Sequence, residues 1–291
     1  MTAAALAILL VLAWLWPGSN ALAAAASGAA VRGAYLAAAA GCALCHTDKA
    51  HGGAPYAGGR AVASRFGIVV TPNITPDRQT GIGSWRKVDF ARAMRWGVAP
   101  DDSHYLPVFP FPFYNRLSRR DLDDLWAFLA TVRPVRQVNG AGSRAAFAAM
   151  RAAVAVAASR FPGSWRPSPL RDAVWNRGGY LVATIGRCGD CHTPRNWLGA
   201  PDRTRFLAGA GAGQHGHGAP DITPDLQTGI GGWSIADIVT LLTDGQTPNF
   251  DFVGGAMTEI VSAISDLDPA DRRAIAIYLK SLKPIPARKK D

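Results

Sequence analysis

Two copies of the motif Cys-x-x-Cys-His contain all four cysteines of this 291-residue chain. The residues of the motifs are Cys42, Cys45 and His46 in the first copy and Cys188, Cys191 and His192 in the second. This spacing is the attachment motif of c-type haem. The two thiols add to the two vinyl groups of one porphyrin, and the adjacent histidine reaches the iron as its proximal ligand. The chain is therefore predicted to carry two covalently bound haem c groups, with the four cysteines as thioether anchors.

Three other uses of a Cys-x-x-Cys pair fit the sequence less well. A disulfide within each pair leaves the following histidine unexplained in both copies. Zinc usually takes four ligands from knuckles that lie close together, whereas these two motifs are 146 residues apart. A thioredoxin-type redox pair is expected between a strand and a helix, but an alanine-rich helical run precedes Cys42. Haem attachment is the interpretation that uses every residue of both motifs.

The rest of the sequence is a tandem duplication. The pattern Arg-Gly-x-Tyr-Leu precedes each cysteine motif, at residues 32–36 and 177–181. The pattern (Asn/Asp)-Ile-Thr-Pro-Asp follows each cysteine motif, and a Thr-Gly-Ile-Gly-x-Trp pattern comes after it. The second pattern ends at Trp85 in the first copy and at Trp233, 148 residues later, in the second. The duplication predicts two modules of similar structure, each with one haem.

Helix signals dominate both modules. Each half closes with apolar residues at three- and four-residue spacing ahead of a proline, and Ser118 and Asp268 are the expected N-caps of these helices. An alanine-rich stretch at 144–159 predicts a further helix between the modules. The run 68–70, which is Ile-Val-Val, is the main strand signal.

The sequence divides into five segments. These are a signal peptide or weak anchor at 1–26, a first module at 28–138, a connector at 139–170, a second module at 171–286 and a tail at 287–291. The apolar run at 3–16 is short for a membrane span, and small residues typical of a cleavage site follow it, although no Lys or Arg precedes it. Export to the periplasm is therefore the expectation.

The chain is basic, with a formal net charge of +10 at pH 7. Each haem adds two propionates, so the protein with haem should carry roughly +6. Such a charge favours an acidic partner or association with an anionic membrane surface. The basic residues are scattered and accompany no known nucleic-acid-binding motif, so no nucleic-acid partner is expected.

The order of these motifs resembles the cytochrome c subunits of membrane-associated bacterial dehydrogenases. Those subunits serve alcohol, aldehyde, gluconate or sorbitol dehydrogenases and some molybdenum hydroxylases. The likeness extends from Arg32 to Pro284. It implies a mainly α fold with two tandem class I cytochrome c domains joined by a helical connector.

The resemblance also implies a function. The chain would be a periplasmic electron-transfer subunit and not itself an enzyme. It would take electrons from the catalytic subunit of a PQQ-, flavin- or molybdenum-dependent dehydrogenase, and would pass them to a quinone, an oxidase or another cytochrome.

The same resemblance implies the iron ligands. His46 and His192 are the proximal ligands, and Met257 falls where these proteins place the distal methionine. Met257 lies 24 residues after Trp233, but the residue 24 positions after Trp85 is Phe109, which has no donor atom. The two haems are therefore expected to differ in coordination, and the first to have the lower potential because a thioether ligand raises it.

Three arrangements remain open for the first iron. The iron can be five-coordinate or bind water. Alternatively, its sixth ligand can be His104 or His51, or it can be Met94. His104 is the best replacement because it lies five residues before Phe109 in the same loop. Met94 is the weakest, since it falls in a predicted helix and suits a core position. An open first iron also leaves a two-haem peroxidase as the alternative function.

Three further residues are candidate contacts for the haem propionates. Trp85 and Trp233 would donate their indole N–H groups, although either ring is equally suited to the core. Arg60 would pair with a propionate, because a guanidinium matches a carboxylate.

Overall fold

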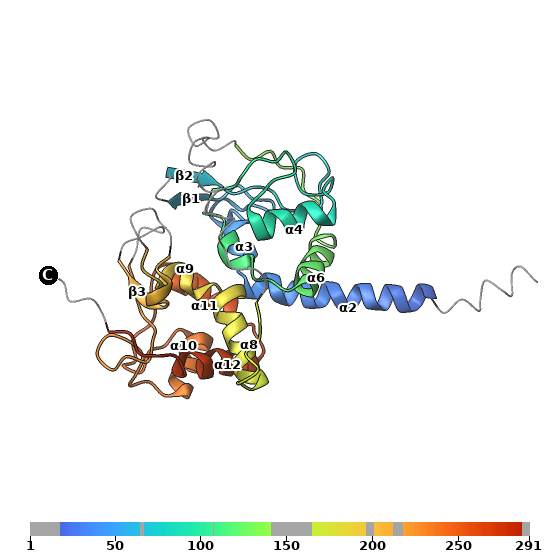
Figure 1. Cartoon of the computed structure of the whole chain (residues 1–291). Coiled ribbons are helices and arrows are strands. Elements are labelled where there is room, and N and C mark those ends of the chain that lie inside the picture. Colours follow the sequence, from blue (N-terminus) through green and yellow to red (C-terminus); the bar gives the residue numbers. More distant parts are fainter. Residues whose placement is uncertain are drawn as a thin grey trace, which may run out of the picture.

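The computed structural model describes residues 18–64, 67–106, 108–140, 165–195, 201–211 and 218–286. This part of the chain is mainly helical with two small two-stranded sheets, as the sequence predicts for the fold class (Figure 1). The predicted helix at 144–159 and the tail at 287–291 lie outside the described residues, as does the apolar run at 3–16.

The first half begins with a long helix that leads directly into the first cysteine motif. Its elements are α2 (Gly18–Ala39), α3 (Cys42–Cys45), β1 (Ala61–Ser64), β2 (Gly67–Val70), α4 (Lys87–Trp96), α5 (Phe111–Tyr114) and α6 (Arg119–Leu129). The strands are antiparallel, with Ala61 opposite Val70. Helix α2 runs through the predicted segment boundary at residue 26, and cleavage near that point stays a prediction.

The second half repeats this order. Its elements are α8 (Ala173–Tyr180), a π-helical turn (Leu181–Ile185), α9 (Cys188–His192), β3 (Ala208–Ala210), β4 (Ala219–Asp221), α10 (Ile235–Asp244), α11 (Ala256–Ile264) and α12 (Pro269–Lys280). Strands β3 and β4 are antiparallel, with Ala208 opposite Asp221. Only β2 had a clear signal in the sequence, because the other strands have three or four residues and little apolar alternation.

In each half the helix before the cysteine motif crosses the closing helix at a glycine. A Cβ atom on Gly33 would lie 1.9 Å from the carbonyl oxygen of Asp124 in α6, and one on Gly178 would lie 2.0 Å from that of Ala274 in α12. Neither position can carry a side chain without moving the two helices apart. This close approach explains the glycine of each Arg-Gly-x-Tyr-Leu motif.

The arginine of each Arg-Gly-x-Tyr-Leu motif forms an ion pair between the same two crossing helices. Arg32 donates through Nε and Nη2 to the two carboxylate oxygens of Asp124, both at 2.8 Å. Arg177 makes the equivalent two-pronged contact with Asp271, at 2.9 and 2.6 Å. Two parallel N–H···O bonds fix the relative orientation of the two groups as well as their distance.

The tyrosine of the first motif binds the second half. Tyr35 Oη donates to Asp271 Oδ2 at 2.5 Å and accepts the backbone N–H of Asp268 at 3.2 Å. Asp268 is the N-cap of α12, where its carboxylate accepts the N–H of Ala270, as predicted. Tyr35 therefore completes the start of a helix that belongs to the other half of the chain.

Tyr180 makes the reciprocal contact. Its hydroxyl accepts the backbone N–H of Ser118 at 3.0 Å and donates to the carboxylate of Asp121. Ser118 is the N-cap of α6, as predicted, and accepts the N–H of Asp121. Each half thus supplies one hydroxyl to the closing helix of the other.

Buried apolar residues of both halves form one continuous cluster. In the first half it includes Leu36, Leu125 and Leu129, and in the second Leu181 and Leu279. The halves therefore share a core as well as hydrogen bonds. Among the described residues, no helix is long and apolar enough to span a membrane.

We expect Gly33→Ala to reduce the free energy of unfolding by about 1–3 kcal/mol or more, because the new methyl group overlaps the α6 backbone. Gly28→Ala in the same helix is the control, since a Cβ atom there meets only the end of Arg32 at 3.5 Å. That change should be neutral or stabilising by up to about 1 kcal/mol. Urea unfolding of the protein with haem measures both, and equal midpoints for the two variants would contradict the crossing argument.

We expect Tyr35→Phe and Tyr180→Phe each to destabilise the fold by about 1–3 kcal/mol, because each leaves a helix N–H without its partner and removes one hydrogen bond from a carboxylate. Tyr56→Phe is the matched control, because the Tyr56 hydroxyl has no hydrogen-bond partner among the described residues. Denaturant unfolding measures the effect, and the slope of the free energy of unfolding against denaturant concentration should not change. A loss in Tyr56→Phe as large as in the other two would show that the reciprocal bonds contribute nothing specific.

Candidate haem-attachment sites

Each cysteine motif forms a short helix that begins after a residue in the left-handed backbone conformation. Gly41 (φ 64°) precedes α3, and Arg187 (φ 43°) precedes α9. All four cysteines are free thiols, so neither motif contains a disulfide. In the described part of the chain, no cluster of three or more His, Cys, Asp or Glu side chains could hold a metal ion such as zinc. Both findings agree with thioether attachment.

The first cysteine of each motif is partly buried. Burial raises the pKa of Cys42 and of Cys188 to about 12. These two thiols are therefore protonated near pH 7, unlike the low-pKa thiolate of a disulfide oxidoreductase. A thioredoxin-type pair, which also fits the sequence less well, does not match these thiols.

The histidine of each motif is bound through one ring nitrogen to a proline carbonyl. His46 Nδ1 lies 2.8 Å from the Pro72 oxygen, and His192 Nδ1 lies 2.8 Å from the Pro220 oxygen. A carbonyl only accepts, so Nδ1 carries the proton and Nε2 keeps its lone pair. Burial lowers the pKa of both rings, which favours the neutral form. A neutral imidazole held in this way is the donor that a haem iron requires, so the residues present fit the group.

The loop after each proline is the repeated (Asn/Asp)-Ile-Thr-Pro-Asp motif. Asn73 Oδ1 accepts from the N–H and the hydroxyl of Thr75, at 2.9 and 2.7 Å, and its Nδ2 donates to the Val135 carbonyl at 2.7 Å. Asp221 accepts from the N–H of Thr223 at 2.7 Å and from the hydroxyl of Thr228 at 2.9 Å. The side chain next to each proline therefore anchors the loop that presents the carbonyl.

The Pro72 and Pro220 carbonyls are functional groups that the sequence reasoning missed. The repeat marked the loops as important, but it gave no reason for their spacing from the cysteine motifs. The glycines of the loops also have a structural reason. A Cβ atom on Gly81 or on Gly229 would lie 2.2 Å from the carbonyl oxygen of the loop threonine. These glycines are required because the backbone of the loop approaches itself closely at both positions.

The two candidate tryptophans occupy matching places. Trp85 and Trp233 are half-buried and pack against the shared core. Neither indole N–H has a hydrogen-bond partner among the described residues. Both N–H groups can therefore donate to a propionate, and this role stays a prediction.

Arg60 connects the first attachment helix to the second half. Its guanidinium donates to the Leu44 carbonyl, inside the first cysteine motif, and to both carboxylate oxygens of Glu259 at 2.9 and 3.0 Å. Glu259 lies in α11, two residues after Met257. The structure thus places Arg60 beside the first motif and pairs it with the Glu259 carboxylate, and its contact with a propionate stays a prediction.

The residues around the two distal positions differ between the halves. Met257 is half-buried in the first turn of α11. Phe109 packs edge to face against Tyr105, with ring centroids 5.8 Å apart. Met94 is buried in the core from α4, as expected of the weakest candidate ligand. His51 is 83% exposed and pairs with Asp48, so it lies on the surface.

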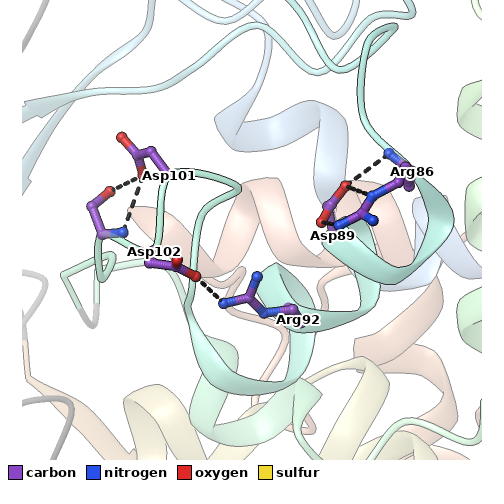
Figure 2. A network of polar contacts seen from close by, with 6 residues as sticks. Arg86, Asp89, Arg92, Asp101 and Asp102 are labelled. Carbon is purple, nitrogen blue, oxygen red and sulfur yellow. Dashed lines mark hydrogen bonds and ion pairs between the residues drawn. The ribbon is translucent and has the colours of Figure 1, made fainter.

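His104 lies in a loop that is held closely against α4. Figure 2 shows Arg92 of α4 bound to Asp102. In the same loop, Asp101 accepts hydrogen bonds from the N–H and the hydroxyl of Ser103. The His104 backbone pairs with that of Val98. The His104 side chain is half-buried, and its buried Nδ1 has no hydrogen-bond partner among the described residues.

Comparison with known proteins agrees with this geometry. Residues 30–133 match the sequence profile of the cytochrome c family. A protein named diheme cytochrome c-type from Cereibacter sphaeroides is 38% identical over 272 residues, which cover 89% of this chain and 88% of that protein.

Two dehydrogenase subunits are also similar. The fructose dehydrogenase cytochrome subunit of Gluconobacter japonicus is 38% identical over 255 residues, which are 86% of this chain and 52% of the subunit. The gluconate 2-dehydrogenase cytochrome c subunit of Pantoea cypripedii is 37% identical over 265 residues, which are 86% of this chain and 59% of that subunit. The chain thus spans little more than half the length of these two subunits. With these relatives and its two attachment motifs, the chain belongs to the family of c-type cytochromes with covalently bound haem that includes the cytochrome subunits of bacterial dehydrogenases.

Proposed function

We propose that this chain is a two-haem electron-transfer cytochrome that accepts electrons from the catalytic subunit of a dehydrogenase. The observation that carries the proposal is the same constellation in each half. Two free thiols lie beside an imidazole whose Nδ1 is bound to a proline carbonyl, which leaves Nε2 for iron. The relative from Cereibacter sphaeroides, named as a dihaem protein over a similar length, supports the count of two.

Haem bound at these positions supplies one-electron redox chemistry, and the chain supplies its surroundings. The cysteines would anchor it, and the proline carbonyls orient His46 and His192. A fixed site of this kind suits electron transfer.

The proposed division of the chain is two tandem cytochrome c domains, at 28–138 and 171–286, joined by the connector at 139–170. The repeated element order and the equivalent crossings at Gly33 and Gly178 support it. The shared core adds that the two domains pack directly on one another.

The two haems should differ in potential. Met257 is the proposed distal ligand of the second haem, whereas Phe109 at the equivalent position of the first half has no donor atom. His104 is the proposed sixth ligand of the first haem, because it is half-buried and its buried Nδ1 has no partner among the described residues. A thioether ligand raises the potential of a haem, so the first haem should be the lower and lie nearer the electron donor.

The proposed partner is a dehydrogenase catalytic subunit in the periplasm. Two of the relatives are named as cytochrome subunits of fructose and gluconate dehydrogenases, which supports a dehydrogenase without selecting a PQQ, flavin or molybdenum type. The proposed acceptor is a quinone, an oxidase or another cytochrome. The net charge of +10 favours an acidic docking face on the partner or an anionic membrane surface.

We expect the purified protein to contain two haem groups per chain, measured by intact mass and by the pyridine haemochrome spectrum. The double variant Cys188→Ser, Cys191→Ser should retain one, because the first motif is complete without them. The matched double variant Cys42→Ser, Cys45→Ser should also retain one. A single haem in the wild-type protein would refute the two-haem proposal.

A potentiometric titration should resolve two midpoints. Met257→Leu should lower the higher midpoint and abolish the far-red absorbance of methionine-ligated haem, because leucine keeps the side-chain volume but has no donor atom. Met94→Leu is the control and should leave both midpoints unchanged. Coincident midpoints, or spectra of two equivalent histidine–methionine haems, would overturn the unequal ligation. Peroxide turnover much faster than that of free haem would favour the two-haem peroxidase instead.

A further inference from the structure

Arg187 occupies a backbone position that glycine occupies in the first half. Both residues precede the first cysteine of a motif, and both have left-handed backbone angles, with φ 64° for Gly41 and φ 43° for Arg187. Glycine adopts this conformation without strain, whereas a residue with a side chain does so at a cost of about 1 kcal/mol or more. Such a residue persists where its side chain is held strongly by its surroundings.

The Arg187 side chain reaches from the second attachment motif to the first. Its guanidinium is nearly buried, with 13% of the side chain exposed. Nε donates to Tyr114 Oη at 3.1 Å, and Tyr114 Oη donates to the carbonyl of Ala40 at 3.1 Å. Ala40 lies two residues before Cys42. A Cβ atom on Gly41 would be 3.9 Å from Arg187 Nη2, so the guanidinium lies directly beside the start of the first motif.

The α5 segment that carries Tyr114 also contacts the second motif. A Cβ atom on Gly189, inside that motif, would lie 3.3 Å from the ring of Phe113. The two attachment helices are therefore bridged by Arg187 and α5. Arg187 is close enough to Cys42, Cys45 and Cys188 to interact electrostatically with all three.

The charge of Arg187 is only partly balanced. Its Nη1 lies 3.6 Å from Asp190, and the same carboxylate binds Arg195. Two guanidinium groups thus share one carboxylate, and these three side chains together retain a positive charge. Because Arg187 and Asp190 are nearly buried, this charge acts through protein and is screened less than a surface charge.

We propose that Arg187 is a positioning residue for electron transfer between the two haems. Arg187 holds both attachment helices together and places a fixed positive charge between the two haems. The inference rests on the proposed function, since it requires haem at both motifs. Reduction of a haem removes one positive charge from it. A fixed cation between the two therefore favours the reduced form of each and raises both midpoints.

The test is a potentiometric titration of the two-haem protein with charge-neutral and charge-keeping variants. Arg187→Gly removes the charge and adopts the backbone conformation of Gly41 without strain. Arg187→Gln removes the charge and keeps a donor of similar reach. Each neutral variant should lower both midpoint potentials. The equilibrium constant for reduction of each haem should fall by about threefold or more, where a tenfold change corresponds to 59 mV. Arg187→Lys should keep both midpoints near those of the wild type, and Arg133→Gln, at an exposed arginine, should change neither.

The outcomes separate this inference from the function on which it rests. Fewer than two haems in the wild-type protein would refute the proposed function. Two haems with unchanged midpoints in the neutral variants would overturn the role of Arg187, and so would a shift confined to one haem. If one neutral variant does not accumulate with both haems, the midpoints of the other neutral variant are compared with those of Arg187→Lys.

Discussion

The hydrogen bond from each motif histidine to a proline carbonyl is the interaction on which the rest of each site depends. It fixes the ring orientation and the tautomer together, so that only Nε2 remains to bind iron. For this bond to form, the loop must place the proline carbonyl next to the motif helix, which lies elsewhere in the sequence. Asn73 and Asp221 meet this requirement by anchoring the loops. The loop repeat is therefore part of the proposed iron site, although none of its side chains needs to touch the iron.

The two halves depend on one another more than the sequence repeat suggests. Tyr35 and Tyr180 each complete the closing helix of the other half, and Arg60 joins the first motif to α11. These contacts join the two halves at several points, and the Arg60 contact lies beside the first attachment helix. Electron transfer between two cofactors falls steeply with their separation, so a rigid junction between the halves has a direct functional value.

Much of the architecture follows from sequence patterns because those patterns are local. The cysteine motifs, the N-caps Ser118 and Asp268, and the burial of Met94 all follow from neighbouring residues or helical spacing. The contacts between the halves could not be predicted, because Tyr35 and Asp271 are 236 residues apart. Arg187 gave no signal either. An arginine before a cysteine motif looks like any other basic residue until its backbone conformation and its partners are known.

The reciprocal tyrosines give the chain the contact pattern of a symmetric dimer whose two protomers are joined in one polypeptide. In such a dimer of separate identical chains, every residue at the interface occurs twice. An arginine at the position of Arg187 would then face its own copy near the axis, and two nearly buried like charges would repel. Covalent fusion removes this constraint, because glycine can stand at one copy of the position and arginine at the other. The joined chain can therefore hold a single charge and two unlike iron sites, which no assembly of identical protomers could provide.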